Sequence, residues 1–204
     1  MKYISLDIET TGLDKHKNQI LEVGMIKDDT ADPLPLSLLS TCRILVIHET
    51  MQIDNFCARL HKNLFEEIHQ IPKDVTMSIS DGCVVDPSIE VPDNHWLVYC
   101  KPEALSAVMA TWIGSGTQNI AGKNAGTFDI PFLKASPGWR ENSYAPRFRR
   151  RVIDPAILFS HPTDDRLPDL QECLERAGIE GEVQHTALED ALDVVKLVRK
   201  GLEL

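Results

Sequence analysis

The N-terminal stretch limits the fold of this sequence more than any other part of it. Ile4, Leu6 and Ile8 alternate with polar or aromatic side chains, which is the period of a half-buried β-strand. Asp7 and Glu9 stand two residues apart, so both carboxylates leave the same face of this strand. Two carboxylates held this close repel each other unless a positive group lies between them. A divalent cation such as Mg²⁺ or Mn²⁺ meets that need through its preference for carboxylate oxygen, and a lysine or arginine partner is the alternative.

Length and charge limit the function classes. A chain of 204 residues is long enough for one sizeable core, so a single domain over residues 1–204 is the default. The apolar share of 43% and the charged share of 25% are ordinary for a soluble globular protein. The net charge of −10 argues against a protein that coats nucleic acid by bulk electrostatics. It leaves room for an enzyme that grips a few nucleotides through metal ions and a local basic patch.

The five cysteines are odd in number and show neither a CxxC pair nor a zinc spacing. We therefore expect free thiols in a reducing compartment. The sequence opens directly into a strand, so we expect no signal peptide, and no apolar run approaches the ~18 residues of a membrane helix. These observations predict a cytoplasmic protein that does not enter a membrane.

The order of the elements predicts an α/β fold. Apolar periodicity and turn residues indicate a strand meander, then helices alternating with strands, which implies a mixed five-stranded sheet flanked by helices. The expected strands cover about 2–9, 20–27, part of 36–48, 119–122 and 152–154. The expected helices carry apolar stripes within 53–68, 105–112, 170–177 and 187–198, and the last two end at Gly178 and Gly201. We expect an irregular insertion or loop at about 71–94 and an irregular basic stretch at 134–151.

Three titratable residues outside the first strand are candidates for a site. Asp129 precedes Pro131 at an expected helix start, and Asp190 lies in the first turns of the last helix. His185 stands five residues before Asp190, and five helical residues turn through about 500°, so we place His185 in the preceding loop. Taken singly, each carboxylate is more typical of a helix cap, and the histidine of a structural or surface residue.

Together these residues resemble a known family. The motifs are Asp7-x-Glu9-Thr-Thr-Gly-Leu13, then Asn124 to Asp129 with Phe-Asp-x-x-Phe-Leu, then His185-x-Ala-x-x-Asp190. Their order and spacing are similar to those of the DEDDh 3′–5′ exonucleases, which have an RNase H-like fold. Leu45-Val-Ile-His48 and the arginine-rich lead into Val152-Ile-Asp154 are similar to the oligoribonuclease branch. Lys123, residues 71–94 and the basic stretch depart from that branch.

The resemblance implies a two-metal hydrolysis of phosphodiesters. It assigns Asp7, Glu9, Asp129 and Asp190 to two divalent ions, Mg²⁺ or Mn²⁺, and makes His185 the general base. Histidine suits that role near neutral pH. The resemblance also implies that Thr10, Thr11, Gly12, Leu13 and Asn124 bind the substrate. There Leu13 would wedge against the terminal base, although a turn-flanking core leucine and a turn-capping asparagine are the plainer alternatives.

The implied function is a metal-dependent 3′–5′ exonuclease that releases nucleoside 5′-monophosphates from single-stranded DNA or short RNA. One alternative is an oligoribonuclease-like enzyme confined to short oligonucleotides. Another is a non-catalytic nucleic-acid-binding or polymerase-binding module, and a third is a metalloprotein without activity. The expected partner is a single-stranded DNA or RNA 3′ end. A polymerase and a second copy of the chain are further candidates.

Overall fold

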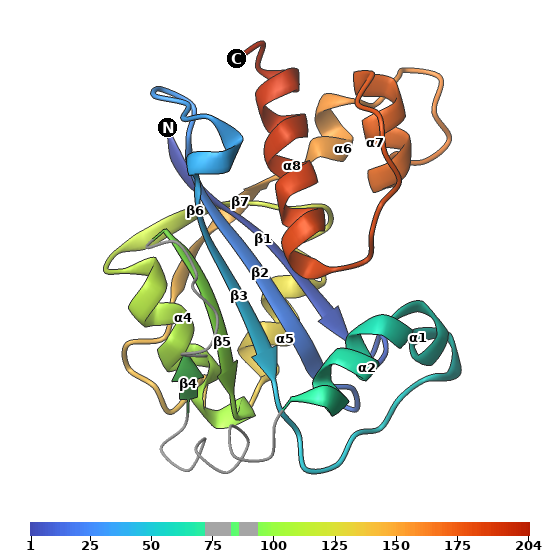
Figure 1. The fold of residues 1–204 in the computed structure, drawn as a ribbon. Coiled ribbons are helices and arrows are strands. Elements are labelled where there is room, and N and C mark those ends of the chain that lie inside the picture. Colours follow the sequence, from blue (N-terminus) through green and yellow to red (C-terminus); the bar gives the residue numbers. More distant parts are fainter. Residues whose placement is uncertain (72–82, 86–93) are drawn as a thin grey trace.

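The computed structural model describes residues 1–71, 83–85 (as backbone) and 94–204. A central sheet with helices on both faces forms the fold, as Figure 1 shows. Within the described residues the strand order is β4-β5-β3-β2-β1-β6-β7. The strands are β1 (Lys2–Thr10), β2 (Ile20–Asp29), β3 (Ser40–Val46), β4 (Cys83–Val85), β5 (His95–Cys100), β6 (Thr117–Ala121) and β7 (Arg147–Ile153). The predicted meander is present, because β1, β2 and β3 pair antiparallel, while β6 and β7 run parallel to β1.

Helices cover both faces of the sheet. The helices are α1 (Asn55–Leu60), α2 (Lys62–Gln70), α4 (Leu105–Ile113), α5 (Asp129–Ala135), α6 (Pro155–Leu158), α7 (Leu170–Ala177) and α8 (Ala187–Gly201), with short 3₁₀ turns at Leu36–Leu38 and Pro102–Ala104. Ile4, Leu6 and Ile8 pack with α4 and α5, whereas Tyr3 packs under α8 on the opposite face. The expectation of a half-buried first strand is therefore wrong, since α8 covers its second face.

The sheet is wider than the five strands predicted, because β5 pairs parallel with β3 and β4 pairs with β5. The irregular insertion or loop predicted at 71–94 lies largely outside the described residues. Within this range the structure describes β4, which is a strand. The prediction that 134–151 is irregular is also wrong toward its end, since residues from Arg147 onward form strand β7. β7 is an edge strand, and exposed edge positions do not need apolar side chains, so their periodicity is weak.

The helix expected within 53–68 is broken into α1 and α2 at His61. Only Cys57 and Leu64 of its predicted stripe are buried, while Phe56 is 63% exposed. The thiols of Cys42, Cys57 and Cys173 are free, as predicted. None of the described helices has the length and hydropathy that a bilayer crossing requires.

Gly24 sets how closely α8 approaches the sheet. It lies opposite Asp7 in the β1–β2 register, so the two residues share the face that α8 covers. A Cβ atom at this position would lie 2.2 Å from the backbone carbonyl of Ala187, the first residue of α8. The Ser5 hydroxyl also donates to Ala191 O at 2.7 Å, which fixes the helix over β1. The start of α8 is thus held directly beside Asp7.

Gly24→Ala is expected to lower the free energy of unfolding by about 1–3 kcal/mol, because backbone atoms of α8 must move to make room for the added methyl group. Urea denaturation followed by circular dichroism measures this change. Gly126→Ala is the matched control, since its Cβ would meet only the side chain of Val152, at 3.4 Å from Cγ2 and 3.8 Å from Cβ. Equal stability of the two variants would contradict the proposed packing constraint.

Candidate active site

Three acidic side chains converge where β1 meets the start of α8. Asp7 and Glu9 extend from the same face of β1, and Asp190 reaches them from the fourth position of α8. One carboxylate oxygen from each of the three lies within 4.8 Å of the other two. Neither Asp7 nor Glu9 has a lysine or arginine ion-pair partner among the described residues. The cation-pair alternative weighed for this strand thus finds no support in the structure.

Asp129 approaches the cluster from the other side of β1. It begins α5, as predicted, and is only 2% exposed. The backbone of Ile8 lies close enough to influence its carboxyl, and its charge in turn acts on Asp7. Asp154, at the end of β7, bonds the backbone N–H of Asn124 at 2.9 Å and so fastens the turn that leads into α5. The predicted fourth acid is therefore held next to the first.

Burial and the repulsion of nearby carboxylates raise the pKa values of all four acids. Burial is the largest cause for each, and neighbouring carboxylates add to it for Asp7 and Glu9. The pKa of Glu9 rises to about 9 and that of Asp190 to about 7, where Asp193 is the second cause. The pKa of Asp129 is raised as well. Without a cation, the cluster therefore keeps protons near neutral pH that free carboxyls would have lost.

These residues fit a divalent metal. Asp129 Oδ1 and Asp190 Oδ1 are buried without a hydrogen-bond partner within the described residues. Buried carboxylate oxygens rarely lack partners, and an absent ion is one accepted reason. An all-carboxylate donor set also matches hard cations of the Mg²⁺ and Mn²⁺ type.

His185 lies in the loop before α8, as predicted, with a positive φ of 54°. Its side chain is exposed and lines a cleft of about 690 Å³ together with Asp7, Asp190 and Lys123. Its backbone lies against the carboxyl of Asp190 and lowers the pKa of that group, although burial prevails there. The histidine thus stands at the mouth of the cleft, with the acids further inside.

Helix α7 holds the loop that carries His185. Gln171 on α7 accepts a hydrogen bond from the Val183 N–H at 3.0 Å and donates to Gly181 O at 3.3 Å. One amide thus fastens two backbone positions of the loop. Asp169, Gln171 and Glu175 also line the cleft, so α7 forms one of its walls.

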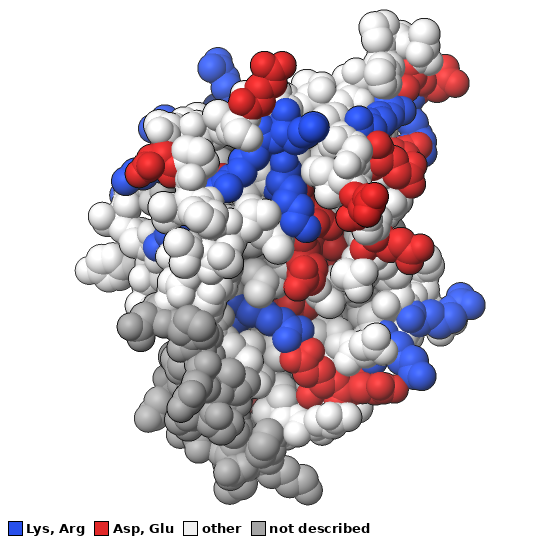
Figure 2. All heavy atoms as spheres, turned by 45° about the horizontal axis from the view of Figure 1, so that its top comes forward, with Lys and Arg blue, Asp and Glu red and all other residues white. Residues whose placement is uncertain are grey.

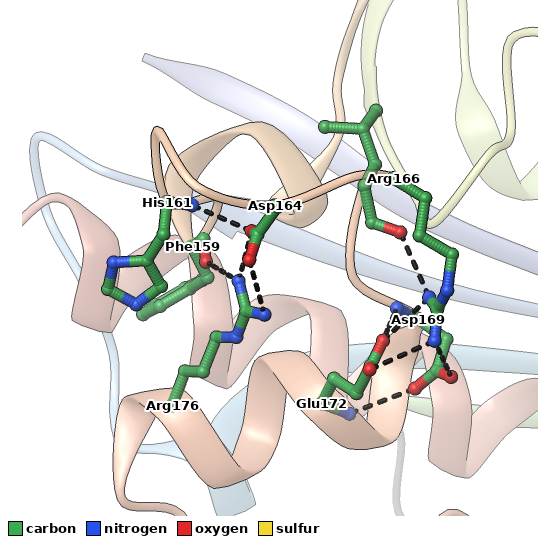
Figure 3. A network of polar contacts seen from close by, with 8 residues as sticks. Phe159, His161, Asp164, Arg166, Asp169, Glu172 and Arg176 are labelled. Atoms are coloured by element: carbon green, nitrogen blue, oxygen red, sulfur yellow. Dashed lines mark hydrogen bonds and ion pairs between the residues drawn. The ribbon is translucent and has the colours of Figure 1, made fainter.

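Two arginine–carboxylate pairs fix α7 itself, as Figure 3 shows. Arg176 makes a bidentate pair with Asp164, at 2.6 and 3.0 Å, and also donates to Phe159 O. Arg166 makes a bidentate pair with Glu172, whose side chain completes the capping box of α7. Bidentate geometry fixes orientation as well as distance. The segment between α6 and α7 is thereby tied to the helix at two points.

A second acidic group lies behind Glu9. Glu22 is opposite Glu9 in the β1–β2 register and is fully buried. Arg43 donates to Glu22 Oε1 at 2.7 Å and bonds Glu67 of α2 with both terminal nitrogens. Glu22 Oε2 has no hydrogen-bond partner among the described residues, and its charge helps raise the pKa of Glu9.

The predicted substrate residues follow β1. The Thr11 N–H is used inside the fold, where it donates to Gln19 O at 2.9 Å, and the Thr10 hydroxyl donates to Gly12 O. Leu13 is 75% exposed, so it is not the core leucine of the alternative reading. The N–H groups of Gly12 and Leu13 bond no acceptor among the described residues.

Asn124 has a positive φ of 61° in the turn before α5, and its side-chain oxygen accepts from the Thr127 hydroxyl. This is the geometry of a turn cap, and substrate binding by Asn124 stays a prediction. Sequence reasoning missed further residues that contact the acids, the His185 loop or the turn before α5, namely Glu22, His61, Asp154 and Gln171. Of these residues, only Asp154 could have been found from the sequence, because it is an acid that directly follows the apolar end of a predicted strand.

The sequence matches no family model and no curated protein. Solved structures do match. Escherichia coli exonuclease I bound to a dA16 oligonucleotide has a TM-score of 0.57 at 12% identity, over 97% of this chain and 40% of that one. Cell-death related nuclease 4 has a TM-score of 0.60 at 12% identity, and the match covers 99% of this chain and 64% of that one. The catalytic unit of Neurospora crassa Pan2, with protease and nuclease domains, has a TM-score of 0.53 at 17% identity. This match covers 98% of this chain and 27% of that one.

The chain has the fold of these nucleases. The likeness confirms the predicted RNase H-like α/β class, with β4 and β5 as additions to the predicted sheet. The chain spans 40% of the length of exonuclease I and 64% of that of cell-death related nuclease 4. At these identities the likeness concerns the fold, and the activity has to be argued from the site.

The raised acid pKa values predict how stability depends on pH. Between about pH 4 and 9 the folded protein keeps protons that free carboxyls, with pKa values near 4, have lost. Without metal, stability contributed by these groups is therefore present below pH 4 and is lost as pH rises toward 9. Saturating Mn²⁺ should raise the melting temperature more at pH 8 than at pH 5, because bound metal needs deprotonated ligands.

Thermal denaturation with a chelator and with Mn²⁺ at several pH values measures both effects. Asp190→Asn should flatten the pH dependence, while Asp32→Asn, an exposed acid outside the cluster, should leave it unchanged. A chelated protein whose melting temperature is constant across this range would contradict the prediction.

Proposed function

We propose that this protein is a divalent-metal-dependent nuclease that shortens single-stranded nucleic acid from its 3′ end and releases nucleoside 5′-monophosphates. The convergence of Asp7, Glu9 and Asp190 within 4.8 Å carries the proposal, together with the cleft that Asp7 and Asp190 line with His185. Asp7, Glu9 and Asp190, with Asp129 beside them, would hold Mg²⁺ or Mn²⁺. When bound, such ions would offset the negative charge of the scissile phosphate and favour deprotonation of the attacking water.

His185 would accept the proton from the attacking water at a ring nitrogen. Its place at the mouth of the cleft supports this role, because solvent reaches the ring while the backbone stays fixed beside Asp190. Gln171 and the α7 wall would limit the excursions of the loop. Leu13 would pack against the terminal base, since its side chain is 75% exposed and free to contact a substrate.

The charge distribution is compatible with an anionic substrate. Figure 2 shows acidic side chains gathered along the middle of one face, with lysine and arginine side chains above and below them. Lys123 is the one lysine or arginine among the described residues that line the cleft. A lysine at the cleft would attract a phosphate, while the buried acids of the cluster would hold the metal. One structural neighbour supports the proposal, because exonuclease I was solved with a dA16 oligonucleotide and, in another structure, with zinc and single-stranded DNA.

One assay tests the proposal. DNA and RNA oligonucleotides of several lengths, labelled at either end, are incubated with the protein in Mg²⁺, in Mn²⁺ or in chelator. We expect a 5′-labelled ladder that shortens from the 3′ end and disappears in chelator. Cleavage of only the shortest RNA would favour the oligoribonuclease-like alternative. Absence of cleavage with either metal, on every substrate, would overturn the proposal and favour a binding module.

A further inference from the structure

His61 occupies the break between α1 and α2 and is 4% exposed. Its φ of −101° and ψ of 28° interrupt the helical path, although its N–H still donates to Cys57 O. This break divides what periodicity predicted to be one continuous helix. The two helices therefore meet at a residue whose side chain is directed inward, toward β1.

The His61 ring lies between two parts of the candidate active site. Its Nε2 is 3.3 Å from Glu9 Oε2, on the first strand. Burial is the largest cause that lowers the pKa of the ring, while the adjacent backbone of His185 raises it. His61 thus lies between a metal-ligand candidate and the loop of the candidate general base.

The ring is not explained by packing alone. Its Nδ1 is buried and bonds no partner among the described residues. A buried polar atom without a hydrogen bond costs free energy that an apolar side chain of similar size would not. A side chain chosen only to fill this space would be phenylalanine or leucine. Because burial keeps the ring from the cleft, contact with substrate does not explain it either.

We propose that His61 is a positioning residue that orients the Glu9 carboxylate toward Asp7 and Asp190 and supports the turn at His185 from behind. This inference rests on the proposed function for the role of the site. The physical reason is that a glutamate side chain has three rotatable bonds, so a metal-binding orientation requires a fixed partner. Groups that fix metal ligands in this way commonly affect metal affinity as well as activity.

The experiment measures Mn²⁺ binding by calorimetry without substrate, beside kcat and KM on an oligonucleotide. His61→Phe keeps the ring shape and removes both nitrogens, and we expect metal affinity and kcat to fall about 10–100-fold, with little change in KM. His61→Gln should restore most of both, because its amide nitrogen can take the place of Nε2. His69→Phe, an exposed histidine on α2, is the matched control and should behave like wild type.

His61→Asn keeps a polar donor but shortens its reach, so it should lose affinity like His61→Phe, and it provides the test if the phenylalanine variant fails to fold. Wild-type Mn²⁺ affinity in His61→Phe or His61→Asn would overturn the inference even if the enzyme cleaves nucleic acid. Conversely, a His61-dependent metal affinity in a protein that cleaves no substrate would uphold the inference and reject the proposed function. A wild-type protein that binds no Mn²⁺ would reject both.

Discussion

Asp7→Asn is expected to reduce cleavage by roughly 10³-fold or more, because the loss of one central member disables a catalytic set that acts as a unit. Asparagine keeps the size of the side chain and removes the charge that faces Asp129, Glu9 and Asp190. The folded structure should persist, and in chelator it should gain stability, since one source of repulsion disappears. Initial rates on a labelled oligonucleotide and thermal denaturation measure the two effects.

Asp32→Asn is the control for a lost negative charge, since Asp32 is exposed and lies outside the cleft. It should retain the wild-type rate. A fall in cleavage rate together with a rise in metal-free stability would show that Asp7→Asn damages the active site and leaves the fold intact. An Asp7→Asn protein with near wild-type activity would show that the chemistry takes place elsewhere.

His185→Asn is expected to lower kcat by about 10²–10⁴-fold, the range that general-base catalysis supplies. Asparagine tolerates the positive φ of this position better than most residues, so the turn before α8 should survive the change. Mn²⁺ affinity should stay near that of wild type, since the four carboxylates are intact. Steady-state kinetics and calorimetry on the same preparation test the two expectations together.

Gln184→Asn, a change in the adjacent exposed residue, controls for disturbance of the loop. It should leave kcat unchanged. If His185→Asn cleaves at the wild-type rate, the proton acceptor is another group. If it loses metal binding instead, then His185 serves the metal site rather than the attacking water.

The elements that sequence predicted well are those with local signals. β1 and β2 show clear alternation or apolar runs, and α7 and α8 are bounded by glycines or capping residues, so short-range patterns are enough. The end of β7 was predicted as a strand at 152–154, but its first residues were missed, because the arginines occupy an edge, where burial does not impose a period. The break at His61 was missed because the apolar stripe runs through it without interruption.

The candidate site divides in the same way. The four acids and His185 could be found because their spacing resembles a known set, and the structure brings the acids together around β1, with His185 beside Asp7 and Asp190 in the cleft. Gln171 and His61 act through contacts between segments distant in sequence, Gln171 with the His185 loop and His61 with β1. A glutamine on an exposed helix face carries no local signal of that contact. Such supporting residues become visible only when the tertiary structure is known.

The packing of α8 on β1 has a consequence for synthesis of the chain. Ser5 and Ala191, which fix that packing, are 186 residues apart, and Asp190 comes from the same helix. The acid cluster therefore stays incomplete until nearly the whole described chain has left the ribosome. Under the proposed function, a nascent chain that lacks α8 is expected to be inactive, and activity begins only when α8 docks on β1.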